Sequence, residues 1–143
     1  GDVDEKDIAP LGAAACDICG SYGAFGVALK GVGTFGGPRN PRVLWVGLEG
    51  DQERLSRFRD NLQERLIPFG VRKETRPFRP HLTLGRFREG VRTGKALEDG
   101  LMEHGHLQSP VVSLNELTLF RSDLRSGGAS YSRLGAWSLA GEK

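Results

Sequence analysis

The order of the predicted elements constrains the fold of this chain more than any single motif. Hydrophobic periodicity and turn residues predict helices over residues 4–19 and 51–67, and strands over 25–32, 42–48, 111–120 and 131–139, with one more strand around His81. The last two ranges read as the arms of a long hairpin, joined by a turn around residues 122–128. Because the elements lack a regular β-α-β alternation, we expect an α+β fold with largely antiparallel sheets.

The helix over 51–67 carries the clearest pattern, with charged residues on one face and an apolar stripe on the other. The stripe comprises Leu55, Phe58, Leu62, Leu66 and Ile67, and we expect it to lie in the core. The helix over 4–19 begins among acidic residues, which complement the helix dipole, and Gly20 stands where a C-cap is expected.

A glycine-rich stretch between the first two strands resembles a phosphate-binding loop in spacing only. Residues 31–36 match the G-x-G-x-x-G pattern of dinucleotide-binding folds. That pattern works only when its last glycine opens a helix, and Pro38, Asn40 and Pro41 prevent a helix there. We therefore reject a dinucleotide-binding fold.

Composition and charge narrow the class of protein. The chain has 143 residues, 38% of them hydrophobic, which is enough for one domain over residues 1–143. It has no apolar run long enough to cross a membrane and nothing that resembles a signal peptide, so we expect a cytoplasmic protein. Since the chain begins at Gly1, we expect it to be a processed product, a tag remnant or a fragment.

Positive charge gathers in one part of the chain. Net charge is only +2, but residues 72–92 contain seven basic and two acidic residues. An anionic ligand near His81 would explain this distribution, and so would a solvated basic face.

Metal and redox sites are weakly supported. Cys16 and Cys19 have the spacing of a redox dithiol or half a zinc site, but no second pair completes a tetrahedral site. His104 and His106 lack neighbouring acids or cysteines, so a surface loop is the better interpretation. We expect neither a metal nor another cofactor.

Residues 79–88 hold the candidate chemistry. On a strand, His81 and Thr83 point to one face, while Leu82 and Leu84 point to the other and are expected in a core. An imidazole beside a hydroxyl and several arginines suits a phosphate ester. A merely structural strand histidine is the alternative.

Three stretches resemble one family when taken together. Residues 80–86 resemble the second His-x-Thr-x motif of the two-histidine phosphoesterases, specifically the RNA 2′,3′-cyclic phosphodiesterases, also called LigT-like proteins or 2′-5′ RNA ligases. Residues 31–35 with 41–47 look like that family's strand pair, and residues 117–131 resemble its C-terminal hairpin. The stretches occur in the family's order along essentially the whole chain.

The resemblance implies a bilobal α+β fold, helices on the outer faces, and two facing His-x-Thr motifs. This sequence has one, so we expect its N-terminal strand and the first motif to be missing. The resemblance makes His81 the proton acceptor, Thr83 a contact to a phosphate oxygen and Arg86 a substrate ligand. Strict alternation, however, puts Arg86 on the face opposite His81.

The implied reaction opens RNA 2′,3′-cyclic phosphate ends to 2′-phosphomonoesters, with reverse 2′-5′ ligation, and uses neither metal nor ATP. The implied partners are RNA ends, in tRNA fragments or nucleotides, and we expect a monomer. Two alternatives follow from the single motif: a catalytically silent domain that binds RNA or nucleotides, or a poorly folded fragment with an exposed sheet edge.

Overall fold

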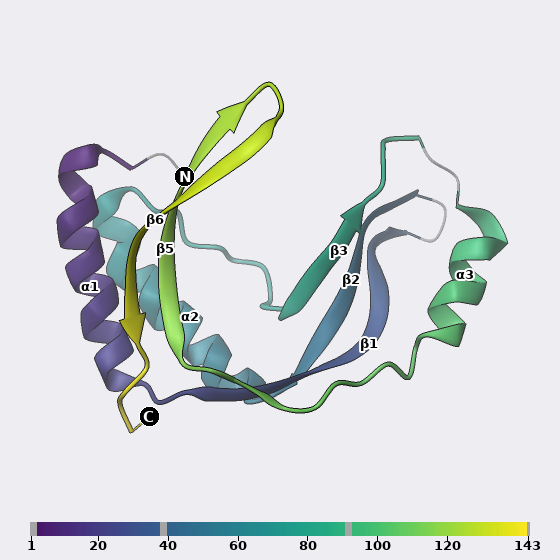
Figure 1. Ribbon diagram of the computed structural model, residues 1–143, viewed down its shortest axis with the longest axis horizontal. Helices are drawn as coiled ribbons and strands as arrows, with labels where there is room; N and C mark the ends of the chain where they lie inside the picture. Colours follow the sequence, from purple (N-terminus) through teal and green to yellow (C-terminus); the bar gives the residue numbers. More distant parts are fainter. Residues whose placement is uncertain (1–2, 38–39, 91–92, 143) are drawn as a thin grey trace. The chain divides into compact units, whose positions relative to one another are not determined.

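The computed structural model describes residues 3–37, 40–90 and 93–142, and the chain divides into two compact units (Figure 1). Unit 1 comprises Gly1–Phe25, Glu53–Arg76 and Leu114–Lys143, and unit 2 comprises Gly26–Gln52 and Pro77–Ser113. Helices and antiparallel strand pairs occur together, so the predicted α+β class is confirmed.

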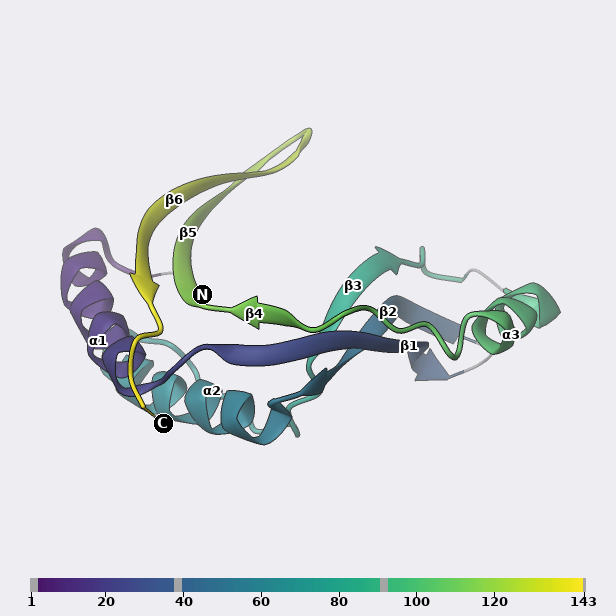
Figure 2. The same cartoon turned by 60° about the horizontal axis from the view of Figure 1, so that its bottom comes forward.

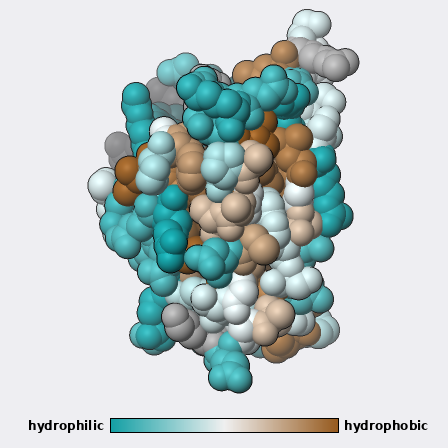
Figure 3. Space-filling view, turned by 90° about the vertical axis from the view of Figure 1, so that its left-hand side faces the viewer, coloured by the Kyte–Doolittle hydropathy of each residue, from teal (hydrophilic) through white to brown (hydrophobic). Residues whose placement is uncertain are grey.

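Unit 1 combines helices with a two-stranded hairpin. Its elements are η1 (Glu5–Asp7), α1 (Ile8–Ser21), α2 (Gln52–Leu66), η2 (Ile67–Phe69), β5 (Glu116–Arg125) and β6 (Gly128–Ser138). Both predicted helices are confirmed, but Gly20 is not the C-cap of the first, which continues to Ser21 and is followed by Tyr22 in extended conformation. On the side that α1 forms, hydrophilic and hydrophobic residues are intermixed over the surface (Figure 3).

An aromatic cluster lies at the centre of unit 1. Phe58 of α2 is 5.2 Å from Tyr22 and 5.5 Å from Phe25 between ring centroids, and all three side chains are buried. The stripe predicted for α2 therefore reaches the core through Phe58, whereas Ile67 lies beyond the helix and is 48% exposed. Buried positions at helical spacing on α1 complete the core, namely Leu11, Ala15, Ile18 and Cys19.

Unit 2 is built on a four-stranded sheet in the order β3-β2-β1-β4. The elements are β1 (Phe25–Gly37), β2 (Asn40–Gly50), β3 (His81–Arg86), α3 (Gly94–Glu103) and β4 (Val112–Leu114). β1 and β3 each pair with β2 in antiparallel fashion, and β4 runs beside β1 (Figure 2). Residues 31–36 continue β1 without starting a helix, which agrees with the rejection of a dinucleotide-binding loop.

Two sequence predictions were wrong at the strand level. The strand expected over 111–120 is divided: Val112–Leu114 joins the sheet of unit 2, while Glu116–Arg125 forms the hairpin. Asn115 lies between them, and its carbonyl accepts a hydrogen bond from the Leu139 amide. A strand-like pattern does not by itself reveal such a change of sheet, because the parts on either side of Asn115 each have apolar residues two positions apart.

The second error concerns burial on β3. Leu82 and Leu84 are 51% and 59% exposed, not in a core. Exposed fractions of this size mean that no layer covers that face of β3, the edge strand, which pairs with β2 alone among the described elements. Alternation sets the direction of a side chain, but burial also needs a layer packed against that face.

Helix length also bears on membrane association. None of the helices in the described part of the chain is both long and apolar enough to cross a membrane.

Candidate functional site

The candidate site lies on β3, and its register with β2 decides which side chains share a face. His81 pairs with Gly47 and Thr83 with Trp45, so their side chains lie on the same face of the sheet. Pro80 immediately precedes the strand and contributes only its carbonyl to the ladder, as acceptor for the Leu48 amide. The predicted common face of His81 and Thr83 is confirmed.

Arg86 reaches that face through a β-bulge. The register shifts by one residue after Thr83, so that Gly85 pairs with Leu44 and Arg86 with Val43. Val43 and Trp45 are two residues apart on β2, and their partners Arg86 and Thr83 therefore share one face. The extra residue is Leu84. The expectation from strict alternation was thus wrong, because it assumed an uninterrupted ladder.

A hydrogen bond determines which ring nitrogen of His81 is free to accept a proton. Nδ1 lies 2.6 Å from the Arg79 carbonyl oxygen. A carbonyl oxygen can only accept, so Nδ1 carries the hydrogen. The neutral imidazole then has its lone pair on Nε2, as a general base requires.

An aromatic side chain contacts His81 on this face of the sheet, and a second aromatic side chain packs on the first. The Phe35 ring lies 4.8 Å from the imidazole centroid at an interplanar angle of 89°, and 5.5 Å from Trp45. Gly33 pairs with Trp45, and a Cβ at this position would overlap the indole ring. Two glycines therefore shape this face, since Gly47 is the direct neighbour of His81 on β2.

Thr83 and Arg86 are available to a ligand. Both side chains are exposed, and neither forms a hydrogen bond or ion pair with any residue that the structure describes. A hydroxyl and a guanidinium on one face, next to an imidazole, can together contact several oxygens of a phosphate group.

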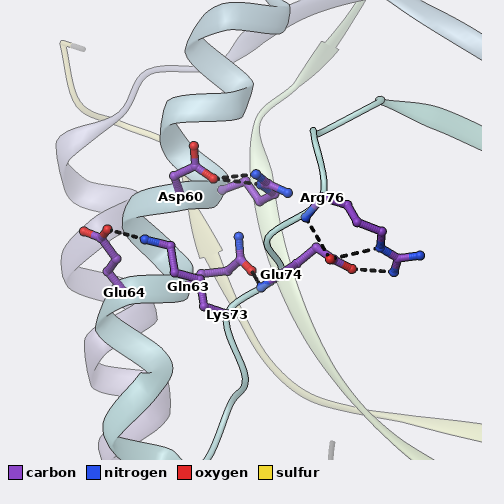
Figure 4. Close-up of polar contacts among 7 residues, drawn as sticks. Asp60, Gln63, Glu64, Lys73, Glu74 and Arg76 are labelled. Carbon is purple, nitrogen blue, oxygen red and sulfur yellow. Dashed lines mark hydrogen bonds and ion pairs between the residues drawn. The ribbon is translucent and has the colours of Figure 1, made fainter.

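The basic residues around the motif divide into two groups. Lys73 and Arg76 are engaged by acids: Lys73 Nζ lies 2.8 Å from Glu64, and Arg76 Nε donates to Glu74 at 3.0 Å (Figure 4). These contacts raise the pKa of Lys73 and lower the pKa of Glu74 to about 2. This half of the basic run is a solvated, ion-paired surface.

In unit 2 the situation differs. Arg79, Arg86 and Arg88 have no carboxylate partner within 3–37, 40–90 and 93–142. Lys30, by contrast, pairs with Glu49 at 2.6 Å. These three arginines of unit 2 are therefore the cations around His81 that remain for an external anion.

The cysteines and the other histidines do not extend the site. Burial raises the pKa of the Cys19 thiol, with a further contribution from Cys16, which disfavours a reactive thiolate. His104 follows the end of α3 and is exposed, like His106. Among the residues that the structure describes, no group of three or more His, Cys, Asp or Glu could hold a metal ion.

Phe35 and Trp45 were not predicted as part of the site. The sequence did carry a signal, because Gly33 and Gly47 leave room on β1 and β2 where strand residues normally project a side chain. The side chains that use this room are known only from the strand register, which places Gly33 beside Trp45 and Gly47 beside His81.

Comparison with known proteins gives a consistent picture. Residues 3–125 match the model of the 2′-5′ RNA ligase superfamily. A curated RNA 2′,3′-cyclic phosphodiesterase of Aeropyrum pernix is 34% identical over 134 residues, which cover 94% of this chain and 74% of the relative. One of Geobacillus stearothermophilus is 29% identical over 99% of this chain, but only 43% of the relative is covered.

Solved structures agree on the fold. A protein of Thermus thermophilus superposes with a TM-score of 0.73 at 22% identity, over 100% of this chain and 75% of the other. Escherichia coli LigT, crystallised with 3′-AMP, gives a TM-score of 0.70 at 24% identity, over 97% and 72% of the two chains. The expected LigT-like α+β fold is therefore confirmed.

Proposed function

We propose that this chain, which belongs to the 2′-5′ RNA ligase superfamily, opens RNA 2′,3′-cyclic phosphate ends to 2′-phosphomonoesters. The observation that carries the proposal is the bulge at Leu84, which brings Arg86 onto the face of His81 and Thr83. The relatives that bear the name RNA 2′,3′-cyclic phosphodiesterase support the choice of substrate class. Exposed arginines without acidic partners in the described ranges support an anionic ligand.

In the proposed reaction, His81 Nε2 accepts a proton from a water molecule as the water oxygen bonds to phosphorus. The bond between phosphorus and the ribose 3′-oxygen breaks, and that oxygen must receive a proton on the opposite side of phosphorus. The phosphate remains on the 2′-oxygen. One imidazole cannot serve both sides, so His81 accounts for the base only.

Thr83 and Arg86 have complementary roles in this proposal. The Thr83 hydroxyl donates to a non-bridging phosphate oxygen, where negative charge must be stabilised during transfer. The Arg86 guanidinium neutralises the phosphate and can donate two parallel hydrogen bonds. Neither role needs a metal ion or ATP.

The same chemistry permits ligation. If the 5′-hydroxyl of a second RNA takes the place of water, the same bond to the 3′-oxygen breaks and a 2′-5′ phosphodiester forms. The strained cyclic ester supplies the free energy, so no nucleotide cofactor is consumed. This ligation is the reverse of the cleavage of a 2′-5′ phosphodiester to a cyclic phosphate and a 5′-hydroxyl. We include it in the proposal as the second reaction of the site.

The product of 2′,3′-cyclic AMP turnover tests the proposal. We expect 2′-AMP, separated from 3′-AMP by chromatography, and a rate reduced about 10-fold or more in Thr83→Val, by loss of one donor to the developing charge. Arg57→Ala, a change in an exposed arginine of α2, is the control and should match wild type. Binding of the cyclic nucleotide without any product would favour the alternative, a silent nucleotide-binding domain.

A further inference from the structure

We propose that Phe35 is a positioning residue for His81, and that its ring holds the imidazole in the plane that keeps Nδ1 on the Arg79 carbonyl. Nε2 is then directed consistently for proton transfer. This inference deepens the proposed function and rests on it, because it concerns the orientation of the proposed base. Its main test, however, measures the histidine itself and does not require turnover.

Two contacts act on His81 and constrain different motions. The carbonyl of Arg79, 2.6 Å from Nδ1, distinguishes between the two flipped orientations of the ring, because only one presents Nδ1 to it. The Phe35 ring, 4.8 Å away and at 89°, constrains the plane of the imidazole. A hydrogen bond weakens as its angle departs from linear, so the contact with Phe35 supports the bond to Arg79.

Phe35 is itself held by the sheet. Phe35 pairs with Val43 of β2. Because Val43 and Trp45 are two residues apart on that strand, Phe35 lies on the same face of the sheet as Trp45. The indole packs on Phe35 at 5.5 Å and occupies the space that a side chain at Gly33 would fill. In the sequence Gly33-Thr34-Phe35, the glycine thus leaves room for the Trp45 indole and the phenylalanine places its ring beside His81.

This arrangement assigns a role to the glycine-rich stretch that is not a phosphate loop. Gly33 leaves room for the Trp45 indole, the indole packs on Phe35, and Phe35 packs on His81.

The tautomer of His81 provides the test. In long-range proton–nitrogen NMR spectra of the ¹⁵N-labelled chain, three histidines are expected, and the His81 signals are those lost in His81→Gln. We expect wild type to have Nδ1 protonated. In Phe35→Leu, the ratio of Nδ1–H to Nε2–H tautomer should fall by about 2- to 10-fold, which corresponds to the free energy of one lost aromatic contact.

Two further variants make the result specific. Phe35→Tyr keeps the ring and should keep the wild-type ratio. Phe120→Leu, a change in a 54% exposed aromatic of β5, controls for general effects of losing a phenyl ring and should also keep it. An unchanged ratio in Phe35→Leu, with dispersed amide signals showing a folded chain, would overturn the inference, as would an equal fall in Phe120→Leu.

Kinetics separate positioning from substrate contact. With 2′,3′-cyclic AMP, Phe35→Leu should lower kcat and leave KM near wild type, and Phe35→Tyr should restore kcat. A raised KM at unchanged kcat would make Phe35 a substrate contact and overturn the positioning role. If wild type gives no turnover, the proposed function fails, while the tautomer ratio still decides this inference.

Discussion

At the scale of single residues, the three proposed site residues offer different chemical groups to a phosphate. His81 offers a nitrogen lone pair, because its other nitrogen is bound to the Arg79 carbonyl. Thr83 offers a hydroxyl, and Arg86 a permanent positive charge. Their exposure and their lack of partners in the described ranges leave the last two groups free to bind.

Replacement of Arg86 tests its role as a phosphate ligand. Arg86→Gln should weaken binding of 2′-AMP about 10- to 100-fold, the equivalent of about 1.5–3 kcal/mol for a charged hydrogen bond. Isothermal titration calorimetry of Arg86→Gln and of Arg57→Gln, an exposed arginine on α2, separates the specific loss from the change in net charge. Equal affinities of Arg86→Gln and wild type would remove Arg86 from the site.

A second residue-scale prediction concerns Glu74. Hydrogen bonds from the Arg76 side chain and backbone lower its pKa from 4.5 to about 2. Since the folded-state pKa lies below the unfolded one, the stability that Glu74 contributes is present above pH 4.5 and is lost as pH falls toward 2.

Carbon-13 NMR of the glutamate side chains measures that titration. The Glu74 midpoint should lie near 2 in wild type and move toward 4.5 in Arg76→Gln. Arg57→Gln should leave it unchanged. A wild-type midpoint near 4.5 would show that the ion pair is not maintained in solution.

At the scale of elements, periodicity predicted most of the secondary structure, and the errors have specific causes. The helices α1 and α2 and the strands β1, β2 and β6 follow from local patterns, whereas β5 continues to Arg125, into the turn that was predicted around residues 122–128. The bulge at Leu84 does not, because a register shift is a property of two paired strands. The exposure of Leu82 and Leu84 likewise depends on what lies against β3, which a strand pattern cannot specify.

Backbone contacts between β2 and β3 test the bulge directly. Nuclear Overhauser effects should connect Val43 with Arg86 and Leu44 with Gly85. An uninterrupted ladder from His81 and Thr83 would instead pair Val43 with Gly85. Observation of that second pattern would return Arg86 to the face opposite His81 and remove the main support for the site.

At the scale of the whole molecule, the two compact units are not separate stretches of sequence. Unit 1 comprises three segments of the chain and unit 2 comprises two, and β1 and α2 each have residues in both units. Unfolding of one unit would therefore disturb the ends of the other. This supports the prediction of a single domain over residues 1–143, which stays a prediction.

The two tryptophans allow a test of that prediction. Trp45 belongs to unit 2 and Trp137 to unit 1. In Trp45→Phe the fluorescence of Trp137 reports on unit 1, and in Trp137→Phe the fluorescence of Trp45 reports on unit 2. Circular dichroism of the same variant gives the unfolding midpoint of its whole backbone, so any effect of the substitution on stability is present in both signals. We expect fluorescence and circular dichroism to give coincident midpoints in each variant. Separated midpoints would indicate two domains that unfold independently.

The central claim is that His81 acts as the base that opens a 2′,3′-cyclic phosphate. The most direct measurement is the rate of 2′-AMP formation from 2′,3′-cyclic AMP by wild type, His81→Ala and the control His104→Ala, whose exposed histidine follows α3. Loss of a general base predicts a fall of about 10²- to 10⁴-fold in His81→Ala, and no change in His104→Ala. Equal rates in His81→Ala and wild type would contradict the account.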